Sequence, residues 1–240
     1  MLVAAAVCPC PPLLVPEVAS GAAPELDAAR AACVDALGVL AAARPDRLVV
    51  IGPVEEAESG TYAEGSRGSF HGFGVDATVR LGRERPAPAD PARPLPASLA
   101  VAAWLLERTG WADAPIEGLA VAEPLAAERC IQIGREIVAA PGERVALLVM
   151  GDASACRTLK APGYLDERAQ PYDAEVARAL DAADGAALAA LDPGLSRGLK
   201  ASGRAPWQVL AGAAQDAGLS GDLLYDEAPY GVGYLVATWS

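Results

Sequence analysis

Histidine, the side chain most often used for acid–base and metal chemistry near neutral pH, is scarce: the 240-residue chain has one, His71. His71 lies in a polar, glycine-rich stretch, where a histidine can contact a ligand but is more often a hydrogen-bonded or surface residue. One chain with one histidine cannot supply the two imidazoles of a histidine-based iron site. Metal or nucleophilic chemistry would therefore depend mainly on cysteines and carboxylates.

Two cysteines, Cys8 and Cys10, follow the apolar run Met1–Val7, and Cys156 follows the apolar run 144–150. Cys8 and Cys10 could form a soft-metal or redox pair. They could equally be small buried hydrophobic residues in a turn stiffened by proline. The same two interpretations apply to Cys156. Five cysteines in a chain of this length predict free thiols rather than a disulfide framework.

Carboxylates also follow apolar runs. Asp152 lies in the segment GDASAC, where it could act as an acid, a base or a ligand, or could simply cap a helix. Glu227 lies beside Asp226 in the segment YDEAPYGVGY. Adjacent carboxylates in a turn are usually solvated, but one of them can face a site if the next strand is buried.

Apolar strands and helices alternate along the chain. Strands are predicted at Met1–Val7, Leu48–Ile51, Val75–Leu81, Ile116–Ala122, Arg144–Met150, Leu223–Tyr225 and Val232–Thr238. Helices are predicted at Pro24–Ala43, Leu99–Thr109, Pro124–Ala140, Tyr172–Ala183, Ala186–Leu191 and Pro206–Ala217. We interpret residues 55–73 as a long loop and 86–96 as a proline-rich linker. The pattern predicts one layered α/β/α domain over residues 1–240, with a largely parallel central sheet.

Such a sheet also predicts where a ligand would bind. In parallel sheets, ligands bind at the loops that follow the carboxyl ends of the strands. In this chain those loops are Cys8–Pro16, Gly52–Phe73 and Gly151–Tyr172.

Composition narrows the classes of partner. The net charge is −12, which disfavours binding to nucleic acid or to anionic membranes. No apolar run approaches the roughly 18 residues of a membrane span. Prolines interrupt the apolar N-terminal segment and no basic residues precede it, so we do not expect a signal peptide. We expect a cytoplasmic protein.

Several segments together resemble the class III extradiol dioxygenase catalytic-subunit family, the LigB-like superfamily that also includes Memo-type proteins. The matching stretches, in order along nearly the whole chain, are CPCPPLLVPE (8–17), PDRLVVIGPV (45–54), VMGDAS (149–154), APGYLDERAQPYDAEVARAL (161–180) and YDEAPYGVGY (225–234). The resemblance implies an α/β fold. It also implies a non-haem Fe(II) held by two histidines and a glutamate, and an acid/base histidine that assists cleavage of a catechol ring by O₂.

The iron-binding pattern is mostly lost in this sequence. Carried over by the resemblance, the first iron-binding histidine falls on Cys10 and the second on Val54, and the acid/base histidine falls on Ala155. Only the glutamate is matched, by Glu227. Val54 and Ala155 have no lone pair to offer a metal, so we do not expect Fe(II) to bind as it does in the family.

These observations nominate a set of site residues. The residues expected to line a ligand site are Cys8, Cys10, Pro53, Val54, His71, Asp152, Ser154, Ala155 and Tyr230. The candidates for catalysis are Cys10, Asp152, Cys156 and Glu227, and three of these, Cys10, Cys156 and Glu227, are also candidates for a metal site.

Three functional hypotheses follow. The first is a diverged LigB-like protein without ring-cleaving activity, which binds a small molecule or a partner at the retained site. The second is a metalloprotein or redox enzyme in which Cys8, Cys10, Cys156 and Glu227 hold Zn or Cu. The third is an enzyme with Cys10 or Cys156 as its nucleophile. A non-catalytic subunit of a larger complex, or a homo-oligomer, is also compatible with the sequence.

Overall fold

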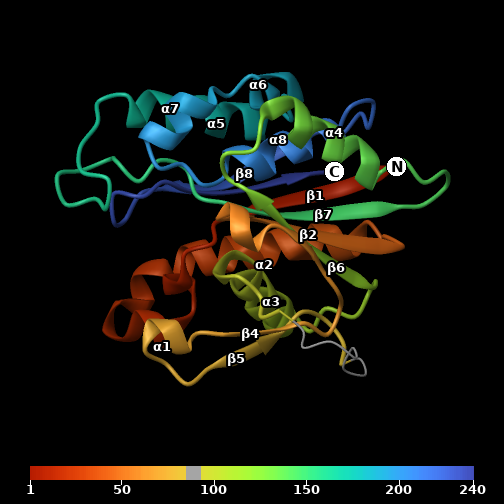
Figure 1. Ribbon diagram of the computed structural model, residues 1–240, viewed down its shortest axis with the longest axis horizontal. Coiled ribbons are helices and arrows are strands. Elements are labelled where there is room, and N and C mark those ends of the chain that lie inside the picture. The colour runs from red at the N-terminus through yellow and green to blue at the C-terminus, as the bar shows by residue number, and fades with distance from the viewer. Residues whose placement is uncertain (85–92) are drawn as a thin grey trace.

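The computed structural model describes residues 1–84 and 93–240. Its main element is a seven-stranded sheet in the order β3-β6-β2-β7-β1-β9-β8 (Figure 1). The strands are β1 (Leu2–Cys8), β2 (Arg47–Val54), β3 (Gly60–Tyr62), β6 (Ile116–Ala122), β7 (Val145–Met150), β8 (Gly221–Glu227) and β9 (Tyr234–Trp239). β6, β2, β7 and β1 are mutually parallel, whereas β3 and β9 run antiparallel to their neighbours. The sheet is therefore mixed, with a parallel centre.

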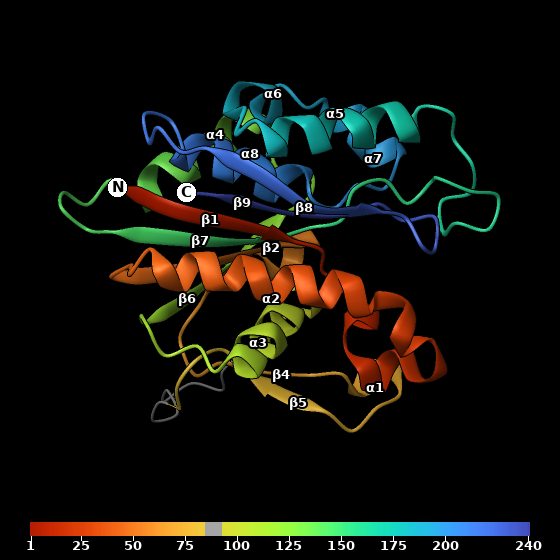
Figure 2. The ribbon, with the colours of Figure 1, turned by 180° about the vertical axis from the view of Figure 1, so that it is seen from behind.

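Helices cover both faces of this sheet (Figures 1 and 2). One face carries α2 (Asp27–Ala42) and α3 (Ala97–Thr109), with the short α1 (Pro16–Ala19) nearby. The opposite face carries α4 (Ala127–Ile137), α5 (Ala169–Asp181), α6 (Gly185–Ala189), α7 (Pro193–Gly198) and α8 (Arg204–Ala213). A two-stranded ribbon of β4 (Arg67–Ser69) and β5 (Thr78–Arg80) packs against α3.

Burial on both faces explains why the central strands are apolar throughout. In β7, Ala146, Leu148 and Met150 belong to the core on the α2–α3 side. Val145, Leu147 and Val149 belong to the core on the α4–α8 side. All six residues are fully buried, as expected for a parallel strand between two helical layers.

The predicted α/β architecture with a mostly parallel sheet and flanking helices is confirmed. The prediction that residues 55–73 form a loop is wrong, because β3 and β4 lie within it. These strands have three residues each, and β4 carries Gly68 at its buried position, so no apolar alternation marks it. Residues 86–92 of the predicted linker lie outside the described residues.

The short helix α7 was also missed, although a local signal for it exists. Asp192 precedes Pro193, and its carboxylate accepts a hydrogen bond from the amide of Leu195 at 2.6 Å. An aspartate at the cap position followed by proline at the first helical position is a typical helix start.

No helix in the described ranges combines the length and the apolar character needed to cross a bilayer.

Helices α4 and α8 approach each other through glycines. A Cβ atom at Gly134 would overlap the carbonyl oxygen of Val209, and one at Gly212 would overlap the carbonyl oxygen of Ile131. Both overlaps involve backbone, which cannot rotate away as a side chain does.

We therefore expect Gly134→Ala to lower the free energy of unfolding by at least about 3 kcal/mol, because the two helices must separate. Gly38→Ala in α2 is the matched control, since a Cβ there meets nothing within 4 Å. It should raise the stability by up to about 1 kcal/mol through helix propensity. Urea denaturation measures both, and equal stability of the two variants would contradict this account of the helix contact.

Candidate functional site

The pairing of β1 with β7 brings two loops together at the carboxyl edge of the sheet. Cys8 pairs with Met150 at the end of this ladder, and the amide of Gly151 donates to the carbonyl of Cys8 at 3.0 Å. Just beyond, the amide of Cys10 donates to Oδ1 of Asp152 at 2.8 Å. Two residues predicted from separate motifs are thus joined directly.

Three further residues complete what we call the edge cluster, which consists of Cys10, Glu123, Asp152, Ser202 and Tyr234. The amide of Asp152 donates to the Ser202 hydroxyl at 3.2 Å. Glu123 follows β6 directly, and Tyr234 begins β9 with only 2% of its surface exposed. Glu123 and Tyr234 each interact electrostatically with Cys10 or Asp152.

The electrostatics of the edge cluster favour protonated groups. Removal from water raises the pKa of Asp152 to about 7; the Cys10 amide opposes this shift and Glu123 adds to it. Burial, with Asp152 and Glu123 nearby, raises the pKa of the Cys10 thiol well above its usual value. Burial likewise raises the pKa of the Tyr234 hydroxyl. Asp152 is therefore the group that can exchange a proton near neutral pH.

Arg204 fixes the position of the loop that carries Glu123. Its buried guanidinium donates to the carbonyl oxygens of Glu123 and Leu125 and to the side chain of Gln208. The same positive charge lowers the pKa of the Glu123 carboxyl, which partial removal from water raises more strongly. Arg204 thus connects the start of α8 to the end of β6.

Ser154 is a framework residue rather than a residue of the edge cluster. Its amide and its hydroxyl both donate to the buried Asp173 carboxylate, at 2.8 Å each. Arg157 donates to the same carboxylate at 3.0 Å. This network attaches the loop after β7 to α5. Ala155, next in sequence, is buried, and its amide donates to Leu199.

The cysteines predicted to act together are distributed over both faces of the sheet. Cys8 lies in the core on the α2–α3 side, where the hydrogen bond with the Cys33 thiol, and then burial, raise the pKa of its own thiol. Cys156 lies in the core on the other side, with its thiol directed to the carbonyls of Gly163 and Leu199. Across residues 1–84 and 93–240, no three His, Cys, Asp or Glu side chains are grouped so that they could hold a metal ion.

The remaining predicted residues have separate positions. Pro53 accepts a hydrogen bond from the buried Ser98 hydroxyl at 2.8 Å, and the side chain of Val54 is buried among apolar neighbours. Glu227 is exposed on β8, opposite Tyr234 in the strand register. Partial removal from water raises the pKa of the Tyr230 hydroxyl, and the nearby Glu25 adds to this shift.

His71 lies away from the edge cluster, in the short 3-10 helix 71–73 between β4 and β5. Its Nε2 bonds to Oδ1 of Asp76 at 2.7 Å, and its side chain is 57% exposed. His71 lines a different cavity, beside the ribbon of β4 and β5.

Sequence reasoning found Cys10 and Asp152 but missed their three companions. Glu123 directly follows a correctly predicted strand, so the rule for carboxyl ends could have found it. Tyr234 lies within the segment YDEAPYGVGY, but nothing in the sequence distinguishes it from the neighbouring tyrosines. Ser202 follows α7, which was not predicted, and no local signal places it near β7.

Comparisons with known proteins bear on the fold alone. No family model and no curated protein matches the chain. The structure is similar to the crystal structure of uncharacterized protein JW3007 from Escherichia coli K12, with a TM-score of 0.56 and 12% sequence identity. The similarity covers 99% of this chain and 100% of that chain. At this identity the similarity concerns architecture and carries no function.

The raised pKa of Asp152 predicts how stability depends on pH. Between the usual carboxyl pKa of 3.8 and about 7, the folded chain holds a proton that the unfolded chain has lost, so stability falls as pH rises through this window. Asp152→Asn should abolish this fall while keeping an oxygen for the Cys10 amide. From about pH 5 to pH 8.5, its stability relative to the unchanged protein should rise by about 2 to 3 kcal/mol.

Urea denaturation at the two pH values measures this difference. Asp113→Asn, in an exposed loop, is the control and should show no such change. If Asp152→Asn and the unchanged protein differ in stability by the same amount at both pH values, the raised pKa of Asp152 is contradicted.

The buried, protonated thiols also predict slow alkylation. With iodoacetamide at neutral pH, Cys8 and Cys10 of the folded protein should react on the order of 100-fold more slowly than in urea-unfolded protein. Mass spectrometry of peptides after timed labelling measures each rate. Fast, selective labelling of Cys10 in the folded state would instead support a cysteine nucleophile.

Proposed function

We propose that this protein is a diverged LigB-like protein that has lost ring cleavage and binds a small molecule at the carboxyl edge of its sheet. The observation that carries the proposal is the edge cluster, in which Asp152 joins the β1 and β7 loops. It lies where ligands bind to parallel sheets. It also contains a carboxyl group whose pKa is about 7, and such perturbed groups concentrate at functional sites.

The chemistry of the cluster defines the class of ligand. Asp152 brings negative charge to the edge once the pH exceeds its pKa of about 7, and the buried Arg204 is already bonded to backbone carbonyls and Gln208. Carboxylates accept hydrogen bonds, so a ligand with hydroxyl or amino donors fits and an anionic ligand does not. Protonation of Asp152 near neutral pH would weaken the acceptor and make binding depend on pH.

The residues present do not fit the iron centre that the resemblance implies. The first iron-binding position is the buried thiol of Cys10, a soft ligand in place of an imidazole. The second is the hydrocarbon side chain of Val54, which has no donor atom. Glu227, the retained position, is exposed on β8. The proposal therefore includes no step at a metal.

Binding and turnover can be separated experimentally with catechol, which carries two hydroxyl donors. We expect saturable catechol binding by isothermal titration calorimetry near pH 8.5, weakened about tenfold by Asp152→Asn through loss of a charged acceptor. Asp113→Asn should bind like the unchanged protein. Protein incubated anaerobically with Fe(II) and then given catechol and O₂ should consume oxygen no faster than the same mixture without protein, and should form no ring-opened product.

Two results would overturn the proposal. Oxygen uptake with a ring-opened product would show that ring cleavage remains. Absence of saturable binding, both by catechol and by a panel of hydroxylated and aminated aromatic fragments in ligand-observed NMR, would remove the binding function. One equivalent of Zn or Cu per chain, lost on Cys10→Ser, would favour the cysteine-based metal site instead.

A further inference from the structure

The β4–β5 ribbon has two chemically different faces. Gly68 and Val79 pair in the ribbon register and face α3, where a Cβ at Gly68 would touch Ala100 and Leu95. Side chains alternate along a strand, so the flanking pairs face the other way. These outer pairs are Arg67 with Arg80, and Ser69 with Thr78. The outer face therefore carries two guanidinium groups beside two hydroxyl groups.

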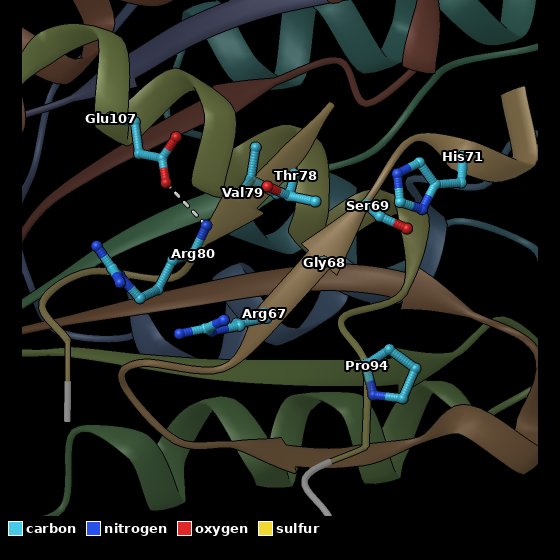
Figure 3. Close-up of a pocket in the computed structure, with 9 residues that line it drawn as sticks. All are labelled: Arg67, Gly68, Ser69, His71, Thr78, Val79, Arg80, Pro94 and Glu107. Carbon is cyan, nitrogen blue, oxygen red and sulfur yellow. Dashed lines mark hydrogen bonds between the residues drawn. The ribbon is translucent and has the colours of Figure 1, made fainter. Parts of the chain in front are cut away.

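This outer face borders a cavity of about 550 Å³, which is within the size range of small-molecule sites. Its lining includes all four outer side chains together with His71 and Glu107 (Figure 3). In Figure 3 the Arg67 and Arg80 side chains extend to the same side of the ribbon. Glu107 accepts a hydrogen bond from the backbone amide of Arg80 at 2.8 Å, so this carboxylate is held by the main chain.

Two arginines directly opposite each other repel, and such pairs are unfavourable in a sheet without a shared counter-ion. Here Oε1 of Glu84 is that counter-ion: it lies 3.3 Å from Nη2 of Arg67 and 3.4 Å from Nη1 of Arg80. One oxygen thus already meets both guanidinium groups, although both contacts are long and the Glu84 side chain is 67% exposed. Exposed ion pairs of this kind contribute little stability and exchange readily.

The nitrogens of Arg80 differ in their access to a ligand. Nε of Arg80 is buried and has no hydrogen-bond partner among the described residues, so an incoming anion does not reach it. The terminal nitrogens of Arg67 and Arg80, which now contact Glu84, are the donors that an anion in the cavity would meet. The Ser69 and Thr78 hydroxyls could donate to other oxygens of the same anion.

We propose that the outer face of the β4–β5 ribbon binds the phosphate group of a small phosphorylated molecule. A phosphate monoester has three terminal oxygens, enough to meet two guanidinium groups and the neighbouring hydroxyls together. A single carboxylate has two oxygens, and that of Glu84 meets the two arginines through one of them. The incoming phosphate replaces Glu84 between Arg67 and Arg80, so this glutamate competes with the ligand.

The site is separate from the edge cluster and does not depend on the function proposed for it. The two sites also select opposite charges, because the cluster presents carboxylates whereas the ribbon presents guanidinium groups. An anionic ligand that binds to this chain is therefore expected at the ribbon.

Isothermal titration calorimetry with phenyl phosphate, and with inorganic phosphate, tests the proposal. The unchanged protein should bind phenyl phosphate saturably, with one site per chain. The double variant Arg67→Gln/Arg80→Gln should weaken binding at least about tenfold, because two charge-assisted hydrogen-bond donors are lost. Glu84→Gln should tighten it about threefold, because the competing carboxylate is removed.

The matched control is Arg178→Gln, which removes the same charge from an exposed position on α5. It should bind phenyl phosphate like the unchanged protein. If the double variant fails to fold, the single variant Arg67→Gln tests the proposal instead, because the Arg67 side chain is 76% exposed. Absence of saturable phenyl phosphate binding by the unchanged protein would overturn the proposal. So would an equal loss of phenyl phosphate affinity in Arg67→Gln and Arg178→Gln.

Discussion

The parallel pairing of β1 with β7 is the interaction on which both the sheet and the edge cluster depend. The two strands come from opposite halves of the chain, and each has a second neighbour, β9 for β1 and β2 for β7. Their ladder ends with Cys8 opposite Met150, so the loops that follow must leave the sheet side by side. The bond from the Cys10 amide to Asp152 then satisfies a main-chain donor that the end of the ladder would leave unpaired.

This dependence explains which parts of the molecule could be predicted from the sequence. Strands buried on both faces are continuous apolar runs, and Ile116–Ala122 was predicted with its observed bounds. Cys10 and Asp152 could be placed together because each follows such a strand. In the ribbon, β5 lies within the predicted strand Val75–Leu81, whereas β4 could not be predicted, because its inward position is Gly68 within a strand of three residues. Its packing depends on α3, which is far away in the sequence.

The partners of Asp152 escaped prediction for a related reason. Ser202 reaches Asp152 because the backbones of Gly151 and Gly203 approach closely, and a Cβ atom at Gly151 would overlap Cα of Gly203. That contact joins the end of β7 to the start of α8 across 50 residues of sequence. Glu123 depends likewise on the buried Arg204, which holds the carbonyls of its loop. Local patterns carry no information on such distant contacts.

The identity of residue 152 supports a role beyond holding the loops. An asparagine could accept the Cys10 amide equally well and would avoid the cost of removing an ionisable carboxyl from water. What an aspartate adds is a proton that it gains and loses near neutral pH, because its pKa is about 7. Ser154 offers the contrast: its buried partner Asp173 is neutralised by Arg157 and serves the framework. Asp152 has no such cation among its hydrogen-bond and ion-pair partners in the described chain, which is consistent with the ligand-binding role that we propose for it.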